Sequence, residues 1–373
     1  MRYTANWKFN QKINAKNRLT AGVIYELHDI NAVDSVRQEN GLFIPDVDFQ
    51  GKASLIQAYT QWQHRFTDKL KLNVGIHGQY LTLTDSKSLE PRLGLEFEPN
   101  KRNTFSIGGG LHSQMQPVLI YFLEEEDASG NLSNQNLDFI RSTHAVVSWN
   151  HLLNENMRLK VEAYHQYLYN VAVDSFASSF SMLNTGADFG FPDRLNLVNE
   201  GTGYNYGLEV TFEKFFSQNY YFLLTTSLFD SKYKGSDGVE RNTLFNSNYV
   251  INTLVGKEFA FNDKFSLTLD TKVTYSGGRR YTPINLDQSI AQSQEILMQD
   301  QTFEAQYAPY FRTDFKIGFR HNTKKFTQTF SVDLQNVTNN DNVFIQGFDP
   351  KDKQIKTTYQ RGFFPDVRYQ ILF

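Results

Sequence analysis

Cysteine is absent from the 373 residues, so neither disulfides nor thiolate metal sites can support this chain. No run of about 18 apolar residues occurs, which excludes transmembrane helices, and the mean hydropathy is -0.48. An excess of one charge is also lacking, because 37 lysines and arginines face 40 aspartates and glutamates, for a net charge of -3. This balance gives no indication of nucleic acid as a partner.

Aromatic residues, in contrast, are abundant for so polar a chain. They make up 15% of the sequence, with 32 phenylalanines and 20 tyrosines. A transmembrane β-barrel combines these properties, because half of its strand residues face water while aromatic girdles mark both membrane interfaces.

Alternation of apolar and polar residues is the strongest local pattern. Leu70, Leu72 and Val74 alternate with Lys71 and Asn73, and the same period of two recurs in stretch after stretch. One such stretch would mean little, but about a dozen in series predict an antiparallel sheet with one apolar and one hydrated face. We expect the apolar face to meet lipid and the polar face to line the lumen. The expected lipid-facing residues are Leu70, Leu72, Val74, Leu159, Val161, Leu267, Leu269, Phe315 and Ile317, and the expected lumenal residues are Lys71, Lys160, Glu162, Asp270, Arg312, Asp314 and Lys316.

Connections between these stretches alternate between short polar turns and longer segments. Bacterial outer-membrane barrels have short periplasmic turns and long extracellular loops, so the alternation orients the chain and places Phe373 at the periplasmic side. The pattern predicts an all-β, up-and-down transmembrane barrel of about 15 strands, whereas single-chain bacterial barrels close with an even number. Since an open edge cannot face lipid, and no signal peptide precedes "MRYTANWKFN", the sequence predicts a barrel that is incomplete at its N-terminus.

Two loop segments are candidate binding sites. Glu124, Glu125 and Glu126, followed by Asp127, could hold calcium, but they lack the spacing of a dedicated calcium loop, and a solvated loop explains them equally well. In "SGGRR" the two glycines turn the chain at the start of a long loop, and Arg279 and Arg280 are either solvated or offered to an anionic ligand.

Signs of a cofactor, a metal centre or catalysis are weak. The eight histidines show no HxxxH pair, and we expect neither a metal nor a cofactor. Ser142 and His144 lie on one face of a predicted strand, but the sequence has no GxSxG motif. We therefore expect no enzyme activity.

The order of several segments resembles a known family. "PRLGLEFEPNKRNTFSIGGGLHSQMQP", "RNTLFNSNYVINTLVGKEF", "YSGGRRYTP" and "SVDLQNVTNNDNVF", followed by the terminal aromatic strand, resemble the C-terminal barrel of TonB-dependent outer-membrane receptors of the Bacteroidetes type. The resemblance runs along nearly the whole chain. It is most characteristic in the last part, where Asn336 and Asn342 precede the closing Phe373.

This resemblance implies a function. In that family a barrel of about 22 strands surrounds an N-terminal plug, and a short N-terminal box engages TonB. Residues 1–373 would then be the barrel domain without the plug and the first strands, and TonB would be reached only through the missing region. The implied role is active import of a scarce nutrient, such as a siderophore, metal complex or glycan, across the outer membrane of a Gram-negative bacterium. The alternative is a self-contained outer-membrane porin or barrel enzyme.

The closing strand carries a second implication of the resemblance. Val367, Tyr369, Ile371 and Phe373 share one face of "FPDVRYQILF", and such a strand is similar to the signal that the barrel assembly machinery reads. The other interpretation is that these four residues only contact outer-membrane lipid, since any lipid-facing strand needs the same alternation.

An assembly signal predicts a specific effect of replacing Phe373. We expect Phe373→Ser to lower the level of assembled barrel in cells several-fold while leaving refolding in detergent unchanged. Quantitative immunoblotting of the outer membrane, with Leu372→Ser on the opposite face as the matched control, measures this. Equal surface levels of Phe373→Ser and the parent would leave these residues with lipid contact alone.

Overall fold

A computed structural model describes residues 1–37, 43–123, 134–185 and 194–373, with side chains described outside 34–49. In this part of the chain no helix is both long and apolar enough to cross a membrane. One sheet of sixteen strands dominates, and fifteen of its strands follow one another in chain order. Its long strands are β1 (Arg2–Lys12), β2 (Asn17–Arg37), β3 (Phe43–Arg65), β4 (Leu70–Leu81), β5 (Ser86–Asn100), β6 (Asn103–Gln114), β7 (Ile140–Asn154), β8 (Met157–Asp174), β9 (Leu197–Ser217), β10 (Tyr220–Lys234), β12 (Tyr249–Ala260), β13 (Phe265–Ser276), β16 (Tyr310–Asn322), β17 (Thr327–Gln335) and β20 (Phe364–Leu372).

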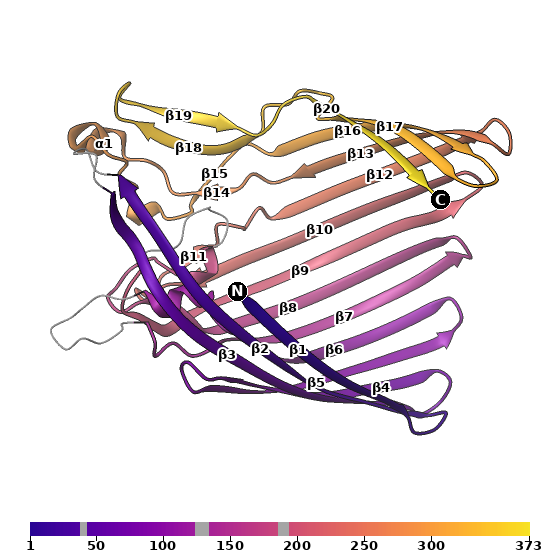
Figure 1. Ribbon diagram of the computed structural model, residues 1–373, viewed down its shortest axis with the longest axis horizontal. Coiled ribbons are helices and arrows are strands. Elements are labelled where there is room, and N and C mark those ends of the chain that lie inside the picture. The colour runs from indigo at the N-terminus through magenta and orange to yellow at the C-terminus, as the bar shows by residue number, and fades with distance from the viewer. Residues whose placement is uncertain (38–42, 124–133, 186–193) are drawn as a thin grey trace.

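Short elements gather at one end of this sheet (Figure 1). They are β11 (Glu240–Asn242), β14 (Arg280–Tyr281), β15 (Ala305–Gln306), β18 (Val343–Asp349), β19 (Gln354–Tyr359), α1 (Leu286–Gln292), η1 (Val118–Phe122), η2 (Met182–Asn184) and η3 (Gln299–Gln301). Tight turns join the strands at the opposite end, which we call the turn end, in contrast to the loop end. The predicted all-β, up-and-down architecture and the strand number are therefore confirmed. The longer connections lie at the loop end as predicted, except that only residues 82–85 join β4 to β5 there.

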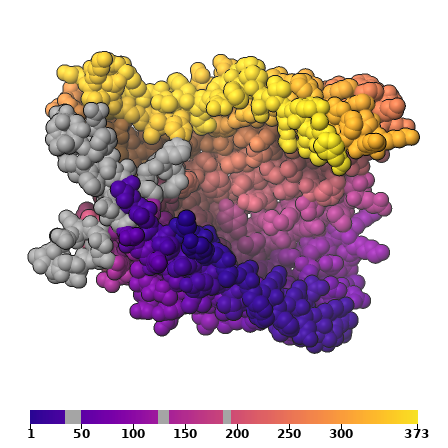
Figure 2. Space-filling model, in the orientation of Figure 1, coloured from indigo at the N-terminus to yellow at the C-terminus, as the bar shows by residue number. Residues whose placement is uncertain are grey.

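The sheet curves into a wall whose two edges remain apart. Among the described strands, β1 pairs only with β2 and β20 pairs only with β17. Figure 2 shows the hollow that lies between the N-terminal and C-terminal strands. Each edge therefore presents backbone N–H and C=O groups that need a partner if the wall lies in lipid.

Register separates apolar from charged side chains as the alternation predicted. Leu269 faces Ile317 across β13 and β16, while the adjacent pair is Asp270 and Lys316. On the outer face Ile317 is 39% exposed. On the inner face opposite charges pair with one another, as where Arg312 Nε donates to Asp314 Oδ1 at 2.6 Å or where Lys71 pairs with Glu96.

Tyrosines on the inner face lie over glycines of the neighbouring strand. Tyr164 is the register partner of Gly207, and a Cβ placed on this glycine would lie 2.7 Å from the tyrosine Oη. Two further pairs repeat the arrangement, Tyr59 with Gly22 and Tyr221 with Gly256. Glycine is needed at these positions for space, because the ring occupies the volume where a side chain would stand.

Among the described residues, the cluster of buried hydrophobic side chains lies near the loop end. Tyr121 and Phe139, from the connection between β6 and β7, are fully buried and pack in one cluster with Leu55 and Leu81 of the wall. Burial raises the pKa of Tyr121 to about 12, and its Oη accepts a hydrogen bond from the Gln116 N–H at 3.0 Å. The described parts of this connection therefore pack against the inner wall.

The assignment of each strand residue to the lipid face or the lumenal face predicts whether a charged substitution is tolerated there. Leu269→Arg should destabilise the membrane-embedded barrel by about 2–4 kcal/mol, because arginine on the lipid face near the midplane is costly. Thr268→Arg is the matched control, since Thr268 lies on the lumenal face and lines a pocket of about 450 Å³ there. Urea unfolding in vesicles compares the two variants. Equal midpoints would mean that the two faces are wrongly assigned.

Candidate functional site

A cavity of about 960 Å³ opens among the connections at the loop end. Four described segments and Arg194 line it, and the segments are residues 174–185 at the end of β8 and after it, residues 237–244 around β11, the long connection 279–307, and 344–346 of β18. Each segment leaves the rigid wall where a strand ends, so the sheet determines where the loops meet. Sites built from loops on a rigid scaffold are the usual location of binding residues.

Gly277 and Gly278 determine how the long connection leaves the wall. Both are buried, and a Cβ on Gly277 would lie 1.8 Å from the Ser247 carbonyl oxygen, while one on Gly278 would lie 1.9 Å from that of Tyr307. Other segments of backbone pass directly against these residues, so only glycine fits. The expected turn at the start of the loop is therefore combined with close packing of three chain segments.

Arg279 and Arg280, the predicted ligand contacts, both line the cavity. Arg280 is committed to the protein: its Nε donates to the Asn246 carbonyl at 3.1 Å, Nη1 to the Glu304 carbonyl at 3.0 Å, and Nη2 to Asn248 Oδ1 at 3.2 Å. All three guanidinium nitrogens therefore hold the loop, and this side chain is chiefly a structural clamp.

Two further arginines of the cavity are also paired. Arg241 and Asp237 form a two-pronged ion pair, with Nη1 to Oδ1 at 2.9 Å and Nη2 to Oδ2 at 2.8 Å. Burial alone would raise the pKa of the Asp237 carboxyl, but hydrogen bonds from Arg241 and from the Val239 N–H outweigh it and lower the pKa below its usual value. Arg194 lies over the Phe180 ring at 4.9 Å.

The hairpin of β18 and β19 is tied to the long connection at the cavity's edge. The Gln346 N–H donates to Tyr307 Oη at 3.1 Å, and the Phe348 N–H donates to Glu295 Oε2 at 2.9 Å. Tyr307 stacks on Tyr281 with ring centroids 4.1 Å apart and planes 6° from parallel. Burial raises the pKa of Tyr307, which keeps its hydroxyl neutral.

Opposite charges balance in the cavity. Its described lining contains four arginines and four carboxylates: Arg194, Arg241, Arg279 and Arg280, with Asp174, Asp237, Glu295 and Asp300. Exposed apolar side chains, among them Phe176, Phe344 and Ile345, stand between them. Such a cavity can hold a ligand with apolar faces and several hydrogen-bonding groups, and its volume is at the upper end of ordinary ligand sites.

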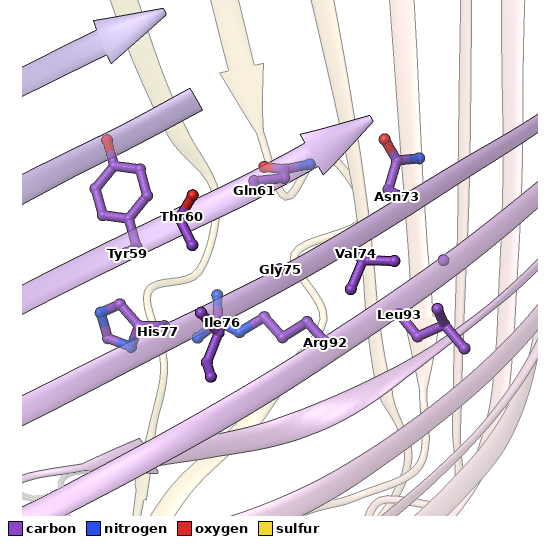
Figure 3. A pocket seen from close by; sticks show the side chains of 11 residues that line it. Tyr59, Thr60, Gln61, Asn73, Val74, Gly75, Ile76, His77, Arg92 and Leu93 are labelled. Carbon is purple, nitrogen blue, oxygen red and sulfur yellow. The ribbon is translucent and has the colours of Figure 1, made fainter. Parts of the chain in front are cut away.

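A second polar cluster lies on the lumenal wall, where His77 and Arg92 approach each other from β4 and β5 (Figure 3). Between them Glu90 is 1% exposed and accepts hydrogen bonds from Arg92 at 2.8 Å and Gln79 at 2.6 Å, with His77 Nδ1 at 2.9 Å and Ser88 at 2.8 Å. A buried carboxylate with this many partners is fully satisfied, so it holds the neighbouring side chains in place.

Ser142 and His144 contact each other on the same inner wall. Ser142 Oγ is 2.7 Å from His144 Nε2, and Gln166 Nε2 reaches the same nitrogen at 3.0 Å. The His112 ring lies beside it, with centroids 4.5 Å apart. A hydrolase triad needs a carboxylate that orients the imidazole, and no described carboxylate makes this hydrogen bond to His144. The pair is part of the polar wall.

The remaining predicted residues lie away from the cavity. Glu124, Glu125 and Glu126 lie outside the described residues. Val367, Tyr369, Ile371 and Phe373 share the exposed outer face of β20 or follow it, towards the turn end (Figure 1). No group of three or more histidines, aspartates or glutamates is arranged for a metal ion in the parts of the chain that are described.

Sequence analysis missed Asp237, Arg241, Tyr281 and Tyr307. The spacing of Asp237 and Arg241 in "SDGVER" is compatible with a local ion pair and could have indicated one. The stacked tyrosines are separated by a long loop, so no local pattern could have connected them.

Comparison with known families identifies this barrel. The sequence profile of the family described as "TonB dependent receptor-like, beta-barrel" matches residues 1–339. The chain belongs to this family. None of the curated protein sequences matches it significantly.

Solved structures share the fold of this receptor barrel at low sequence identity. The outer membrane transporter YddB from Escherichia coli superposes with a TM-score of 0.67 at 12% identity, over 100% of this chain and 54% of that chain. The ferric yersiniabactin uptake receptor FyuA from Yersinia pestis gives 0.65 at 10% identity, over 99% and 53%. The ferric-catecholate import receptor Fiu from E. coli K12 gives 0.65 at 12% identity, over 100% and 54%. The receptor barrel spans about half the length of these structures.

Removing the Arg280 clamp should loosen the long connection. Arg280→Met leaves the buried Asn246 carbonyl without its donor, at a cost of about 1–3 kcal/mol. We expect faster proteolysis within residues 279–307 of the membrane-embedded receptor barrel. Lys351→Met, which removes an exposed positive charge elsewhere at the loop end, is the control and should cleave at the parental rate. Identical cleavage of both variants would mean that Arg280 does not hold the loop.

Proposed function

We propose that this chain is the membrane wall and the outer ligand vestibule of a receptor that imports a scarce nutrient across the outer membrane. The observation that carries the proposal is the cavity at the loop end of a barrel of this family. In an outer-membrane barrel the long loops face outwards, so the cavity would be the first part of the wall that a nutrient meets.

The outer face supports a location in lipid. Val74 and Ile317 are exposed apolar residues, and the inner face beside them carries ion pairs. We further propose that additional strands of the same barrel pair with β1 and β20, since neither edge could face hydrocarbon unpaired. Import would take its energy from TonB through a domain other than this wall, as in receptors of the Bacteroidetes type that the sequence resembles.

The ligand is proposed as a class of nutrient. FyuA and Fiu take up ferric yersiniabactin and ferric catecholates, respectively, according to their names. Here the balanced charges of the cavity favour selection by shape and hydrogen bonds over attraction of a net charge. A siderophore, another metal complex or a glycan could be selected by shape and hydrogen bonds in this way, provided that it offers apolar faces to Phe176 and Phe344.

We also propose that Val367, Tyr369, Ile371 and Phe373 form the signal for the barrel assembly machinery. They share a face of β20, and their exposure supports this, because a signal must be accessible before the strand is embedded. Outer-membrane lipid would then replace the machinery as the partner of the same face.

Growth on single nutrients tests the import function. A strain lacking the full-length receptor is compared with its parent on ferric siderophores, oligosaccharides and other large nutrients at limiting concentration. We expect one class to be lost in the deletion strain and equally in a strain without TonB. Parental growth on every nutrient tested, or growth that does not depend on TonB, would contradict import.

Tyr281→Ala then tests the cavity on that nutrient. Tyr281 lines the cavity, and loss of an aromatic contact with the nutrient worth up to about 1.5 kcal/mol should raise the half-saturating concentration by up to about tenfold at unchanged surface level. Tyr3→Ala, on a strand far from the cavity, should change nothing.

A further inference from the structure

Two turns at the turn end repeat one pattern. The sequences "NAKN" at 14–17 and "NKRN" at 100–103 join β1 to β2 and β5 to β6. The strand beside each carries a tryptophan and a histidine two residues apart, Trp62 with His64 and Trp149 with His151. Register places the histidine opposite the last asparagine of the turn in both cases. All of these side chains are on the outer face.

Hydrogen bonds in the first turn fix the orientation of both amides. Asn14 Oδ1 accepts from the Lys16 N–H at 2.9 Å, the Asn17 N–H at 2.9 Å and Asn17 Nδ2 at 3.0 Å. Asn17 Oδ1 therefore points the other way, where Trp62 Nε1 donates to it at 3.0 Å and His64 Nδ1 lies at 2.8 Å.

The second turn has the same geometry. Asn100 Oδ1 accepts from the Arg102 N–H, the Asn103 N–H and Asn103 Nδ2, each at 3.0 Å. Asn103 Oδ1 accepts from Trp149 Nε1 at 3.1 Å and lies 2.8 Å from His151 Nδ1. The matching distances show that the two turns form the same local structure. We call each set of two turn asparagines with its tryptophan and histidine an interfacial module.

The interfacial module determines which ring nitrogen of its histidine carries the proton. An amide oxygen can only accept, so Nδ1 of His64 and of His151 must carry the proton. In the neutral ring Nε2 is then an acceptor, and neither Nε2 has a hydrogen-bond partner among the described residues. An exposed cation, Lys16 or Arg102, directly precedes the asparagine in the turn.

We propose that each interfacial module binds the headgroup of a phosphatidylethanolamine molecule. The Lys16 or Arg102 cation would pair with the phosphate, the histidine Nε2 would accept from the ammonium, and the tryptophan would lie at the headgroup level that its ring prefers. A choline headgroup has no N–H to donate to Nε2, so the module distinguishes ethanolamine from choline, whereas a glycerol headgroup would offer Nε2 only a neutral hydroxyl donor. The proposal rests on the proposed membrane location.

A third turn provides a natural control. Asn262 Oδ1 accepts from the Lys264 and Phe265 N–H groups at 2.9 and 3.0 Å, so the turn is of the same kind. Phe265, however, occupies the place of Asn17 and Asn103, and His321 stacks on it with centroids 4.4 Å apart. No amide oxygen fixes its proton on Nδ1, so this histidine is not held as an acceptor.

Lipid retention by the full-length receptor tests the proposal. The receptor is purified from outer membranes, exposed to equal amounts of phosphatidylethanolamine, phosphatidylcholine and phosphatidylglycerol, and examined by native mass spectrometry. We expect about tenfold enrichment of the ethanolamine lipid over the choline lipid, equivalent to about 1.4 kcal/mol, with two retained molecules. The double variant His64→Phe with His151→Phe should lose the enrichment, whereas His321→Phe should keep it.

The possible results distinguish failure of the lipid site from failure of the proposed membrane location. Equal retention of the three lipids by the parent, or the same enrichment in the double variant, overturns the interfacial module as a lipid site. A receptor that is absent from the outer-membrane fraction overturns the proposed location instead. Circular dichroism shows whether the double variant is folded. If it is not, His64→Gln with His151→Gln provides the comparison, because glutamine retains polarity without the fixed Nε2 acceptor.

Discussion

Backbone hydrogen bonding in lipid is the constraint on which the rest of this structure depends. Hydrocarbon offers no partner to an N–H or C=O group, so every membrane strand needs a neighbour on both sides. The chain meets this need by pairing each long strand with the next in sequence. Such a meander leaves two edges, at β1 and β20, and it separates the connections into a turn end and a loop end. Both proposed binding regions follow from that separation.

Strand pairing also determines which side chains line the inner face of the wall. Because successive side chains point to opposite faces, the inner face takes the polar half of each strand. Its charges satisfy one another across strands, as at Glu90, and tyrosines fill the space above glycines such as Gly207. Polar pairing and the packing of tyrosines over glycines therefore stabilise the described part of the inner wall. The buried cluster around Tyr121 serves a different purpose, since it attaches one loop to the wall.

Period-two alternation predicted the strands and their two faces because it depends on neighbours only two residues apart. The sheet confirms it at Leu269 and Asp270, which face opposite sides. The loop cavity could not be predicted in this way. Arg280 illustrates the reason: Asn246 and Asn248 come from the connection before β12, and Glu304 comes from the far end of the long connection that contains Arg280. A sequence shows that an arginine is present, but whether it meets a ligand or a carbonyl depends on contacts between distant segments.

Paired charges in the cavity have a consequence for how a ligand is held. A guanidinium that already donates to carbonyls, or that shares two hydrogen bonds with Asp237, has little left to offer an anion. Binding would then depend on shape, on stacking and on hydrogen bonds from uncharged groups, which salt screens only weakly. Tyr307 connects these contacts to the β18 and β19 hairpin through the Gln346 N–H. A ligand that moved the tyrosine stack would therefore also move the hairpin at the rim, because Tyr307 contacts both.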